Sequence, residues 1–435
     1  MEIVLTTAYI AFFLFLIRKL TFFKVDGPSR NMISALFLLK ICAGFVMFLL
    51  YTYHYTDRNT ADIFKYFDDG RAILAVLFDN PIHYLQLILG INTDASYLQG
   101  YLENTNHWFK PYDSRAYNDT RTIIRFNAIV GLFSMGYYQV HNVVINFLSL
   151  AGLLLVYKAF LPFLKNKSME LAIGVFLIPS VIFWGSGVLK EGILLMGIGL
   201  TLYHGFILIT DDKKWINLVW LIAGVALIAL SKFYVLLALA PAFICYILVA
   251  KTSIKYTSIK YAVVLTLLLA LGTLIGKLNP ETSALQAIAQ KQHNFIRLAD
   301  SLQSGSKIEV STLELTFTSF ALNSPAALGN VLFRPHILEA QSPVILLAAI
   351  ENAMLLLLLA LFLFFFKFES THINLLLFCL TFVLILYLLI GYTTPVMGAI
   401  VRYKAPALPF LYVMLLLIFD KDKFASKIGY PKILN

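Results

Sequence analysis

The sequence predicts an all-α fold: a polytopic transmembrane helical bundle of about 11 spans, with two long outer-face loops that contain interfacial helices. Of the 435 residues, 60% are hydrophobic and 13% are charged, whereas a soluble domain has about 45–50% apolar and about 25% charged residues. The mean hydropathy is +0.79, and apolar stretches recur that approach the roughly 20 residues needed to cross a bilayer. We therefore expect residues 1–435 to form a single integral membrane domain.

The expected spans follow the apolar stretches in chain order. They lie near residues 2–17, 31–53, 138–160, 169–183, 189–209, 216–230, 233–250, 261–276, 343–366, 373–391 and 405–419. Segments 169–183 and 216–230 are short, so either could tilt against its neighbours or stop before the far surface.

Basic residues in the short connections indicate the orientation, because Lys and Arg in short loops are retained on the cytoplasmic side. With these spans the basic connections fall on one side, and their residues include Arg18, Lys19, Lys24, Arg30, Lys158, Lys165, Lys167, Lys251, Lys255, Lys260, Lys367 and Lys421. This predicts an inner-membrane protein with its N-terminus outside, its C-terminus in the cytoplasm, and the loops 54–137 and 277–342 on the outer face. The net charge of +10 is then mostly a retention signal, with contact to anionic lipid, and requires no nucleic acid.

The first outer loop has a composition that suggests local structure. Residues 73–77 and 84–89 are apolar runs too short to span, which is typical of helices that lie along the interface. Tyr and Trp are frequent in the same loop, including Tyr66, Tyr101 and Trp108. An interfacial aromatic belt explains such residues, and aromatic platforms beside carboxylates in a sugar-binding cleft are the alternative.

The sharpest chemical signal in this loop is the acidic run at 62–71. If the run is helical, Asp62, Lys65, Tyr66 and Asp69 share one face at spacings of three, four and seven residues. A carboxylate beside the membrane could act as a general base that takes a proton from an acceptor hydroxyl. The alternative is that Asp68, Asp69 and the following glycine end a helix or form a solvated turn.

Arg121 and Arg125 are four residues apart and would project from one helix face at the outer surface. Paired guanidinium groups suit phosphate recognition. Snorkelling of both side chains toward lipid headgroups is the alternative.

The stretch 179–192 combines a proline with three glycines between two spans. Irregular backbone at membrane depth is tolerated where protein covers it or a wet cavity adjoins it, so we expect this stretch to line a cavity. Lys190 and Glu191 stand at the start of the next span, where free backbone N–H groups attract anions. The alternative is a tight outer turn with a surface ion pair.

Further charged residues are expected on the outer side, namely Lys232, Arg334, Glu339, Arg402 and Lys404. Arg402 and Lys404 precede the last predicted span, a position that opposes the retention rule unless something such as an anionic substrate holds them.

Glu351 lies inside an apolar span, where an ionised side chain is costly unless it is paired. It is expected to be the partner of an inward-facing cation, and a proton relay is the alternative.

Several of these motifs together resemble bacterial envelope glycosyltransferases of the GT-C type, which use polyprenyl-phosphate sugars. The motifs are the acidic run of the first outer loop, the arginines before the next span, the Pro-Ser-x-x-Phe-Trp-x-Ser-Gly-x-x-Lys-Glu stretch at 179–191, the Phe-Arg-Pro at 333–335 and the Arg-Tyr-Lys-x-Pro-x-x-Pro at 402–409. The resemblance implies an outward-facing cavity that a lipid-linked sugar enters from the bilayer, a catalytic Asp68 or Asp69, and basic side chains on the phosphate. The chain departs from the family in an additional span before the acidic loop and in lacking an obvious soluble C-terminal domain. These departures leave open the related O-antigen and exopolysaccharide polymerases.

The sequence therefore predicts a membrane glycosyltransferase that moves a sugar from a polyprenyl-phosphate donor to a glycan or lipid acceptor on the outer face. Asp69 is the expected base with Asp68 as the alternative, and Asp62, Tyr66, Glu191, Glu339 and Glu351 support the site. The expected phosphate-binding residues are Arg121, Arg125, Lys190, Arg334, Arg402 and Lys404. The carboxylates of Asp68 and Asp69 could also hold Mg²⁺ or Mn²⁺.

Two other classes of function stay open. A transporter of lipid-linked sugar or small molecules would favour charges near the bilayer midplane and interrupted helices. A non-catalytic component whose outer loops dock a partner is the third possibility. The sugar, the acceptor and the number of donor phosphates are not determined by the sequence.

Overall fold

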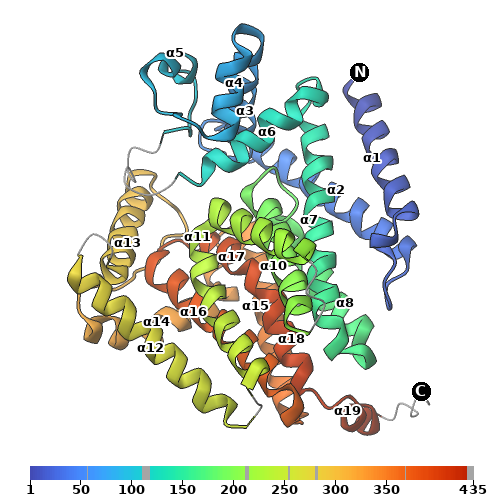
Figure 1. The fold of residues 1–435 in the computed structure, drawn as a ribbon, viewed down its shortest axis with the longest axis vertical. Coiled ribbons are helices and arrows are strands. Elements are labelled where there is room, and N and C mark those ends of the chain that lie inside the picture. The colour runs from blue at the N-terminus through green and yellow to red at the C-terminus, as the bar shows by residue number, and fades with distance from the viewer. Residues whose placement is uncertain are drawn as a thin grey trace. The chain divides into compact units, whose positions relative to one another are not determined.

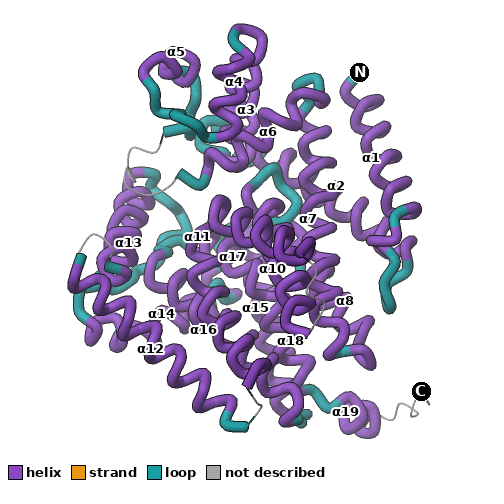
Figure 2. The backbone as a smooth tube through the Cα atoms, viewed as in Figure 1, coloured by secondary structure: helices purple, strands orange, loops and turns teal. Residues whose placement is uncertain are grey.

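The computed structural model describes residues 1–55, 57–109, 118–210, 215–252, 255–279, 283–367 and 369–428. Within these ranges the chain forms α-helices, short 3-10 helices and loops, and no strand occurs there (Figure 2). Two isolated bridges, Lys307 to Val396 and Phe366 to Phe419, are the only β-type pairings in the part described. The predicted all-α fold is confirmed.

Eight helices in the described ranges are long and apolar enough to cross a membrane. They are Arg30–Tyr53, Tyr138–Phe163, Lys190–Thr210, Trp215–Thr252, Thr257–Leu278, Pro343–Phe364, Ser370–Thr393 and Met397–Ile418. These helices indicate a membrane protein in a lipid bilayer. The sequence predicts about 11 spans, three more than the eight in the described ranges. The difference arises in three parts of the chain, described in the next two paragraphs.

The first and fourth predicted spans form helices, but these helices are not long and apolar enough to cross a membrane. Helix α1 (Glu2–Lys19) covers the predicted 2–17, yet Glu2, Arg18 and Lys19 at its two ends leave its apolar stretch too short. The predicted 169–183 is divided between α8 (Ser168–Phe176) and α9 (Pro179–Trp184). Pro179 explains the interruption, because a residue before proline disfavours the α conformation.

The predicted spans 216–230 and 233–250 belong to one interrupted helix, α11 (Trp215–Thr252). At 1.5 Å per residue its 38 residues would extend for about 57 Å, nearly twice the ~30 Å hydrocarbon core. Lys232 breaks the helix with φ −152° and ψ 85°. The break therefore lies where the sequence predicts a connection.

The last span begins earlier than predicted. It runs from Met397 to Ile418 through α17 (Met397–Lys404), a 3-10 turn at Ala405–Ala407 and α18 (Leu408–Ile418). Arg402 and Lys404 therefore lie inside this span and not before it, which corrects the sequence-based placement. The charge of Lys404 is tolerated there because its ammonium group binds protein oxygens, as described below.

The remaining helices are as follows, in chain order: α2 (Arg30–Tyr53), α3 (Asp62–Asp79), α4 (Pro81–Leu89), α5 (Gln99–Leu102), α6 (Thr120–Ser134), α7 (Tyr138–Phe160), α10 (Lys190–Thr210), α12 (Thr257–Leu278), α13 (Ala284–Ser301), α14 (Phe317–Phe333), α15 (Pro343–Phe364), α16 (Ile373–Thr393) and α19 (Lys421–Ile428). The chain divides into two compact units. Unit 1 contains Met1–Pro162, Val175–Leu177 and Val181–Leu236, and unit 2 contains Phe163–Gly174, Ile178–Ser180 and Leu237–Asn435.

Helices α1, α2, α6 and α10 of unit 1 pack against α7 (Figure 1), and glycines allow the close contact between α7 and α10. A Cβ on Gly199 of α10 would lie 2.2 Å from the carbonyl oxygen of Gly152 on α7, and a Cβ on Gly152 would lie 2.5 Å from Leu195. In a bilayer such close packing replaces the hydrophobic effect as the force that associates helices. The glycines therefore determine how closely α10 approaches α7.

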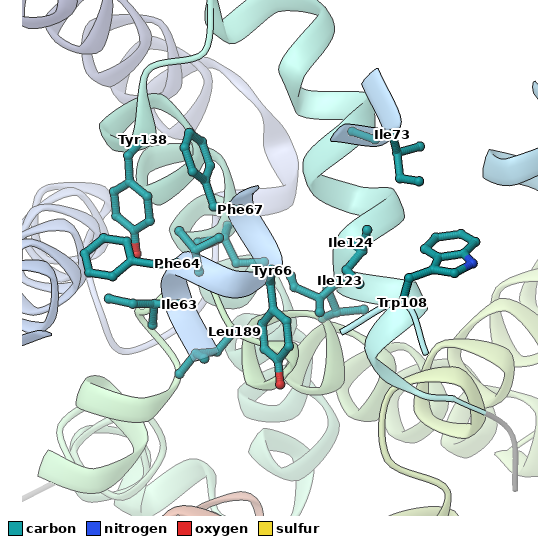
Figure 3. Packing of buried hydrophobic residues seen from close by; sticks show 14 of the residues in the cluster. Ile63, Phe64, Tyr66, Phe67, Ile73, Trp108, Ile123, Ile124, Tyr138 and Leu189 are labelled. Atoms are coloured by element: carbon teal, nitrogen blue, oxygen red, sulfur yellow. The ribbon is translucent and has the colours of Figure 1, made fainter. Parts of the chain in front are cut away.

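Helices α3, α4 and α6 pack together near the start of α7 (Figure 1). The buried apolar cluster of this region joins Phe64 and Phe67 of α3 to Ile123 and Ile124 of α6 and to Tyr138 of α7 (Figure 3). The predicted helical character of 73–77 and 84–89 is confirmed, since these runs lie in α3 and α4. In its described residues, the predicted first outer loop is thus largely made of packed helices.

Some of the basic connections contact neighbouring segments within each unit. In unit 1, Lys158 donates to the carbonyl of Phe22 at 2.5 Å and Arg30 donates to that of Arg18 at 2.5 Å. In unit 2, Lys167 donates to Leu416 and Phe419, both at 2.6 Å. These contacts agree with the retention rule for the connections involved, while the direction of the chain across the membrane stays a prediction.

Candidate functional site

Asp69 lies in the middle of α3, so the alternative that Asp68 and Asp69 end a helix is wrong. Only 1% of Asp69 is exposed. Its two carboxylate oxygens accept the backbone N–H groups of Asn106 at 2.7 Å and His107 at 2.8 Å. Burial raises the pKa of Asp69 from its ordinary value, and the two N–H groups oppose that shift. Asp69 thus anchors the 106–107 backbone to α3.

Asp68 is bound by an arginine from the segment before α3. Arg58 donates to both of its oxygens, at 2.7 and 2.8 Å, in the bidentate arrangement that is strongest for this pair. The Asp68 side chain is one-third exposed, at 33%. Asp68 is therefore accessible, but it already holds a cation.

Tyr66 is the centre of a polar cluster that we call the Tyr66 cluster, made of Asp62, Lys65, Tyr66, His107, Asp119 and Lys190. The Tyr66 ring extends from α3 with its hydroxyl pointing away from the Phe64 and Phe67 rings (Figure 3). Its centroid lies 6.0 Å from that of His107 and 5.9 Å from the Lys190 ammonium group. The aromatic ring therefore links two sets of polar groups.

The first set surrounds His107. Its Nδ1 lies 2.8 Å from the carbonyl oxygen of Asn106, so Nδ1 carries the proton in the neutral ring and Nε2 is the acceptor. Nε2 lies 3.4 Å from Lys65 Nζ and 4.0 Å from Asp62. Burial lowers the pKa of His107, which favours the neutral ring at pH 7.

The second set is the ion pair of Lys190 and Asp119, with 2.7 Å between Nζ and Oδ2. The exposed fractions of the side chains are 9% for Lys190 and 27% for Asp119. Lys190 begins α10, and Gly192 packs on Ile145 of α7. The start of α10 thus lies beside a point on α7 that is roughly 10 Å along the helix axis from Tyr138, the first residue of α7.

The segment around Asp119 is held by the backbone that Asp69 anchors. Asn118 donates through Nδ2 to the carbonyls of His107 at 3.2 Å and Trp108 at 2.8 Å. Thr120 donates through Oγ1 to the His107 carbonyl at 3.0 Å. A path of hydrogen bonds therefore runs from Asp69 through His107 to the residues on both sides of Asp119.

Glu191 and Lys232 form a second ion pair, buried in unit 1. Their charged atoms are 2.8 Å apart and each side chain is 3% exposed. Removing one member would leave an uncompensated buried charge. Lys190 pairs with Asp119, and Glu191 pairs with Lys232 at the break in α11. The alternative of a tight turn with a surface ion pair is therefore wrong.

Arg121 and Arg125 do lie on one helix, α6, as predicted. Both guanidinium groups contact the Trp108 ring, at 4.9 and 5.4 Å from its centroid. Arg121 also binds the Trp108 carbonyl, Thr93 and Asp94, and Arg125 binds the Leu87 carbonyl. The two arginines thus hold the segment after α4 and the 108 region against α6.

The remaining predicted residues belong to unit 2. Glu351 is 8% exposed, and its Oε2 accepts the N–H of Ser180 at 2.7 Å and the hydroxyl of Ser180 at 2.8 Å. Lys404 lies near enough to stabilise the Glu351 charge. Glu351 therefore holds the start of α9, and its predicted pairing with a cation stays a prediction.

Lys404 fastens the end of α14 to α15. It donates to Asn352 at 2.9 Å and to the carbonyls of Val331 and Arg334 at 3.1 and 3.3 Å. Arg334 pairs with Glu339 at 3.1 Å, and Arg402 is half-buried on α17. The predicted phosphate-binding residues are therefore divided between the units, with Arg121, Arg125 and Lys190 in unit 1 and Arg334, Arg402 and Lys404 in unit 2.

Lys40 is a charged residue that the sequence reasoning passed over. It lies midway along α2, is 2% exposed, and donates to the Gly185 carbonyl at 3.0 Å and the Ser186 hydroxyl at 3.2 Å. It holds the irregular segment between α9 and α10. A lysine inside the apolar stretch 31–53 is the signal that could have identified it.

His107 and Asp119 were also passed over, because neither stands in a recognisable motif. Among the described residues, no group of three or more His, Cys, Asp or Glu side chains could hold a metal ion. Mg²⁺ and Mn²⁺ thus have no preassembled ligand set in those ranges. No protein-family model, curated protein or solved structure matches the chain.

Proposed function

We propose that the chain is a membrane glycosyltransferase that moves a sugar from a polyprenyl-phosphate-linked donor to a glycan or lipid acceptor on the outer face of a bacterial inner membrane. The observation that supports this most is the pairing of Asp119 with Lys190 beside Tyr66. It places a proton acceptor and a phosphate-binding cation side by side. These are the two groups that transfer from a phosphate-linked sugar requires.

In the proposed reaction the acceptor hydroxyl attacks the anomeric carbon of the donor sugar. The new carbon–oxygen bond forms as the bond from that carbon to the phosphate oxygen breaks, and the phosphate leaves with the electron pair. Asp119 takes the hydroxyl proton, and Lys190 stabilises the charge that develops on the phosphate. Phosphate binding draws Lys190 from Asp119 and so leaves the carboxylate available as a base.

This proposal changes the roles expected of the acidic run. Asp69 uses both oxygens to bind backbone N–H groups, so it acts as a positioning residue for the segment that carries Asp119. Asp68 is bound to Arg58. Asp119 is preferred as the base because its ion-pair partner, Lys190, is the cation that the phosphate would attract.

The set of phosphate-binding residues narrows in the same way. Arg121 and Arg125 use guanidinium donors to hold their own unit together, and Lys404 binds three protein oxygens. Lys190 is the cation of the predicted set that lies within the Tyr66 cluster. Lys65, whose ammonium group is 3.4 Å from His107, is a second cation in that cluster.

The test uses purified protein in liposomes with polyprenyl-phosphate and polyprenyl-diphosphate sugars and a lipid or glycan acceptor. Asp119→Asn is expected to lower the transfer rate by about 10²–10⁴-fold, the usual contribution of a general base. Glu103→Gln is the matched control, because Glu103 is an exposed carboxylate in the same outer region. Transfer at the wild-type rate by Asp119→Asn would overturn the assignment.

Transport of a lipid-linked sugar is the second candidate function, because the helical structure is interrupted twice and charged side chains are buried inside spans. The interruptions are those between α8 and α9 and at Lys232 of α11, and the buried charges include Lys40 and Glu351. Interrupted helices and intramembrane charges are typical of transporters. Movement of the labelled donor between leaflets, with no transfer to any acceptor, would favour this function.

A further inference from the structure

Unit 2 contains a polar cavity of about 150 Å³ that is separate in sequence from every residue of the Tyr66 cluster. It lies among α13, α14, α16 and the segment 309–313, and its polar lining comes from Gln292, Glu309, Ser311, Asn323, Asn330 and Arg334. We propose that this cavity binds a single sugar ring, neutral or carrying an amino group. The binding can be measured without donor or turnover, so it stands or falls independently of the proposed transfer.

The walls of the cavity are fixed by Gln292, which is 3% exposed. Its Nε2 donates to the carbonyls of Ser311 at 3.0 Å and Tyr392 at 2.7 Å, and its Oε1 accepts the Leu313 N–H at 2.9 Å. One amide thereby holds the 309–313 segment to α13 and α16. The cavity is therefore formed in advance of any ligand, as small-molecule sites usually are.

The base of the cavity is equally rigid. A Cβ on Gly391 of α16 would lie 2.2 Å from the carbonyl oxygen of Ala327 on α14, and both residues line the cavity. Such close backbone packing permits little relative movement of the two helices.

Polar groups in the lining remain available for a ligand. The side chains of Glu309, which is exposed, and Asn330, which is half-buried, make no hydrogen bond or ion pair with other described residues. Asn323 donates through Nδ2 to the Ser319 carbonyl at 2.8 Å. Amides and hydroxyls both donate and accept hydrogen bonds, and sugar hydroxyls do the same, so the lining matches a polyhydroxylated ring.

The charged groups of this region argue against the phosphate role that the sequence suggested for Arg334. Arg334 already pairs with Glu339 at 3.1 Å, and Glu309 adds a second carboxylate at the cavity. Within the lining, the charges of Glu309 and Arg334 balance, and the Arg334 guanidinium is already engaged by Glu339. The Glu309 carboxylate would attract an amino group and oppose an anion, so we expect the ligand to be neutral or cationic.

The size of the cavity limits the ligand to one ring. Its volume of about 150 Å³ equals the share of about five liquid waters at ~30 Å³ each. It is smaller than the ~300–1,000 Å³ of sites for drug-sized ligands. A longer glycan would therefore place one sugar residue inside the cavity and leave the rest outside it.

The test is saturation-transfer NMR on the full chain in nanodiscs, with glucose, galactose, glucosamine and inorganic phosphate as probes. At least one of the three sugars is expected to bind saturably, and inorganic phosphate is expected neither to bind nor to compete. Asn330→Leu should weaken sugar binding by about ten-fold or more, because a buried hydrogen bond to the ligand is lost. Ser311→Ala, whose side chain is exposed, should weaken binding without affecting folding.

Glu314→Gln is the matched control, since Glu314 is an exposed carboxylate five residues from Glu309 and is not part of the lining. Its affinity for the sugar should equal that of the wild type. The proposal is overturned if none of the three sugars binds, if Asn330→Leu and Ser311→Ala both bind as the wild type does, or if phosphate binds and Arg334→Gln abolishes that binding.

Discussion

The carboxylates of α3 differ in their chemistry because each has different partners. Asp69 is almost fully buried and accepts hydrogen bonds from two backbone N–H groups, whereas Asp68 accepts two hydrogen bonds from Arg58. Asp62 lies 4.0 Å from the His107 imidazole. A base must be within reach of a hydroxyl proton, and Asp69 is covered on both oxygens. Its place in the acidic run therefore serves the folding of the 106–107 backbone.

Replacing Asp69 by asparagine tests this positioning role. The amide retains one acceptor and turns its NH2 toward a second N–H donor, so we expect the free energy of unfolding to fall by about 1–3 kcal/mol. The pKa of Asp69 is raised in the folded state. The ionised form is therefore the less favourable one there, and the wild type loses stability as the pH rises from 3.8, the ordinary pKa, through the folded pKa.

Thermal unfolding in detergent across this pH range is the measurement. Asp69→Asn should lower the Tm and flatten the pH dependence at the acidic end. Equal Tm values for the two proteins at every pH would show that the two N–H contacts do not anchor the segment.

At the scale of elements, glycines set the spacing of the unit 1 helices. Gly199 touches the carbonyl of Gly152, whereas a Cβ added to Gly272 of α12 would meet no atom within 4 Å. Gly199→Leu should therefore force α7 and α10 apart and cost about 1–3 kcal/mol or more. Gly272→Leu is the matched control and should leave the Tm unchanged or raise it, because leucine favours a helix over glycine.

The readout is the Tm of each variant together with its yield as a monodisperse protein in detergent. An equal loss of stability in both variants would mean that helix propensity or lipid contact, and not the contact at Gly152, governs the effect.

The apolar stretches predicted most helices because hydrophobicity over about 20 residues is a local property. The placement of Arg121 and Arg125 on one helix was also predicted from local spacing, whereas the helix over the acidic run was only one of two possibilities. The break at Lys232 was expected as a connection, but its partner Glu191 is 41 positions away. Lys40 likewise binds Gly185, 145 positions away. The pattern of residues within one segment cannot predict pairings between distant segments. The ion pairs and the Tyr66 cluster could therefore be identified only from the structure.

At the scale of the whole molecule, the basic connections predict which loops face the cytoplasm. Lys158 contacts the connection at Phe22 and Lys167 contacts the end of α18 at Leu416, and the retention rule assigns such basic connections to the inside. The exposed positions Lys24 and Lys423 should therefore be cytoplasmic, and the exposed Glu103 should face outward.

Single cysteines at these three positions, in a chain whose Cys42, Cys245 and Cys379 are replaced, test the orientation. A membrane-impermeant maleimide added to intact spheroplasts should label Glu103→Cys. It should label Lys24→Cys and Lys423→Cys only after the membrane is opened. The opposite labelling pattern would place the Tyr66 cluster on the cytoplasmic side and would rule out an acceptor on the outer face.

The most direct test of the central claim separates donor binding from chemistry in a single turnover. Wild type and Asp119→Asn are saturated with labelled polyprenyl-phosphate sugar in liposomes, the bound donor is quantified, and acceptor is then added. The account predicts that Asp119→Asn binds the donor at least as well as the wild type and transfers the sugar at least about 100-fold more slowly. Equal single-turnover rates at equal occupancy would contradict the assignment of Asp119 as the base that works beside Lys190.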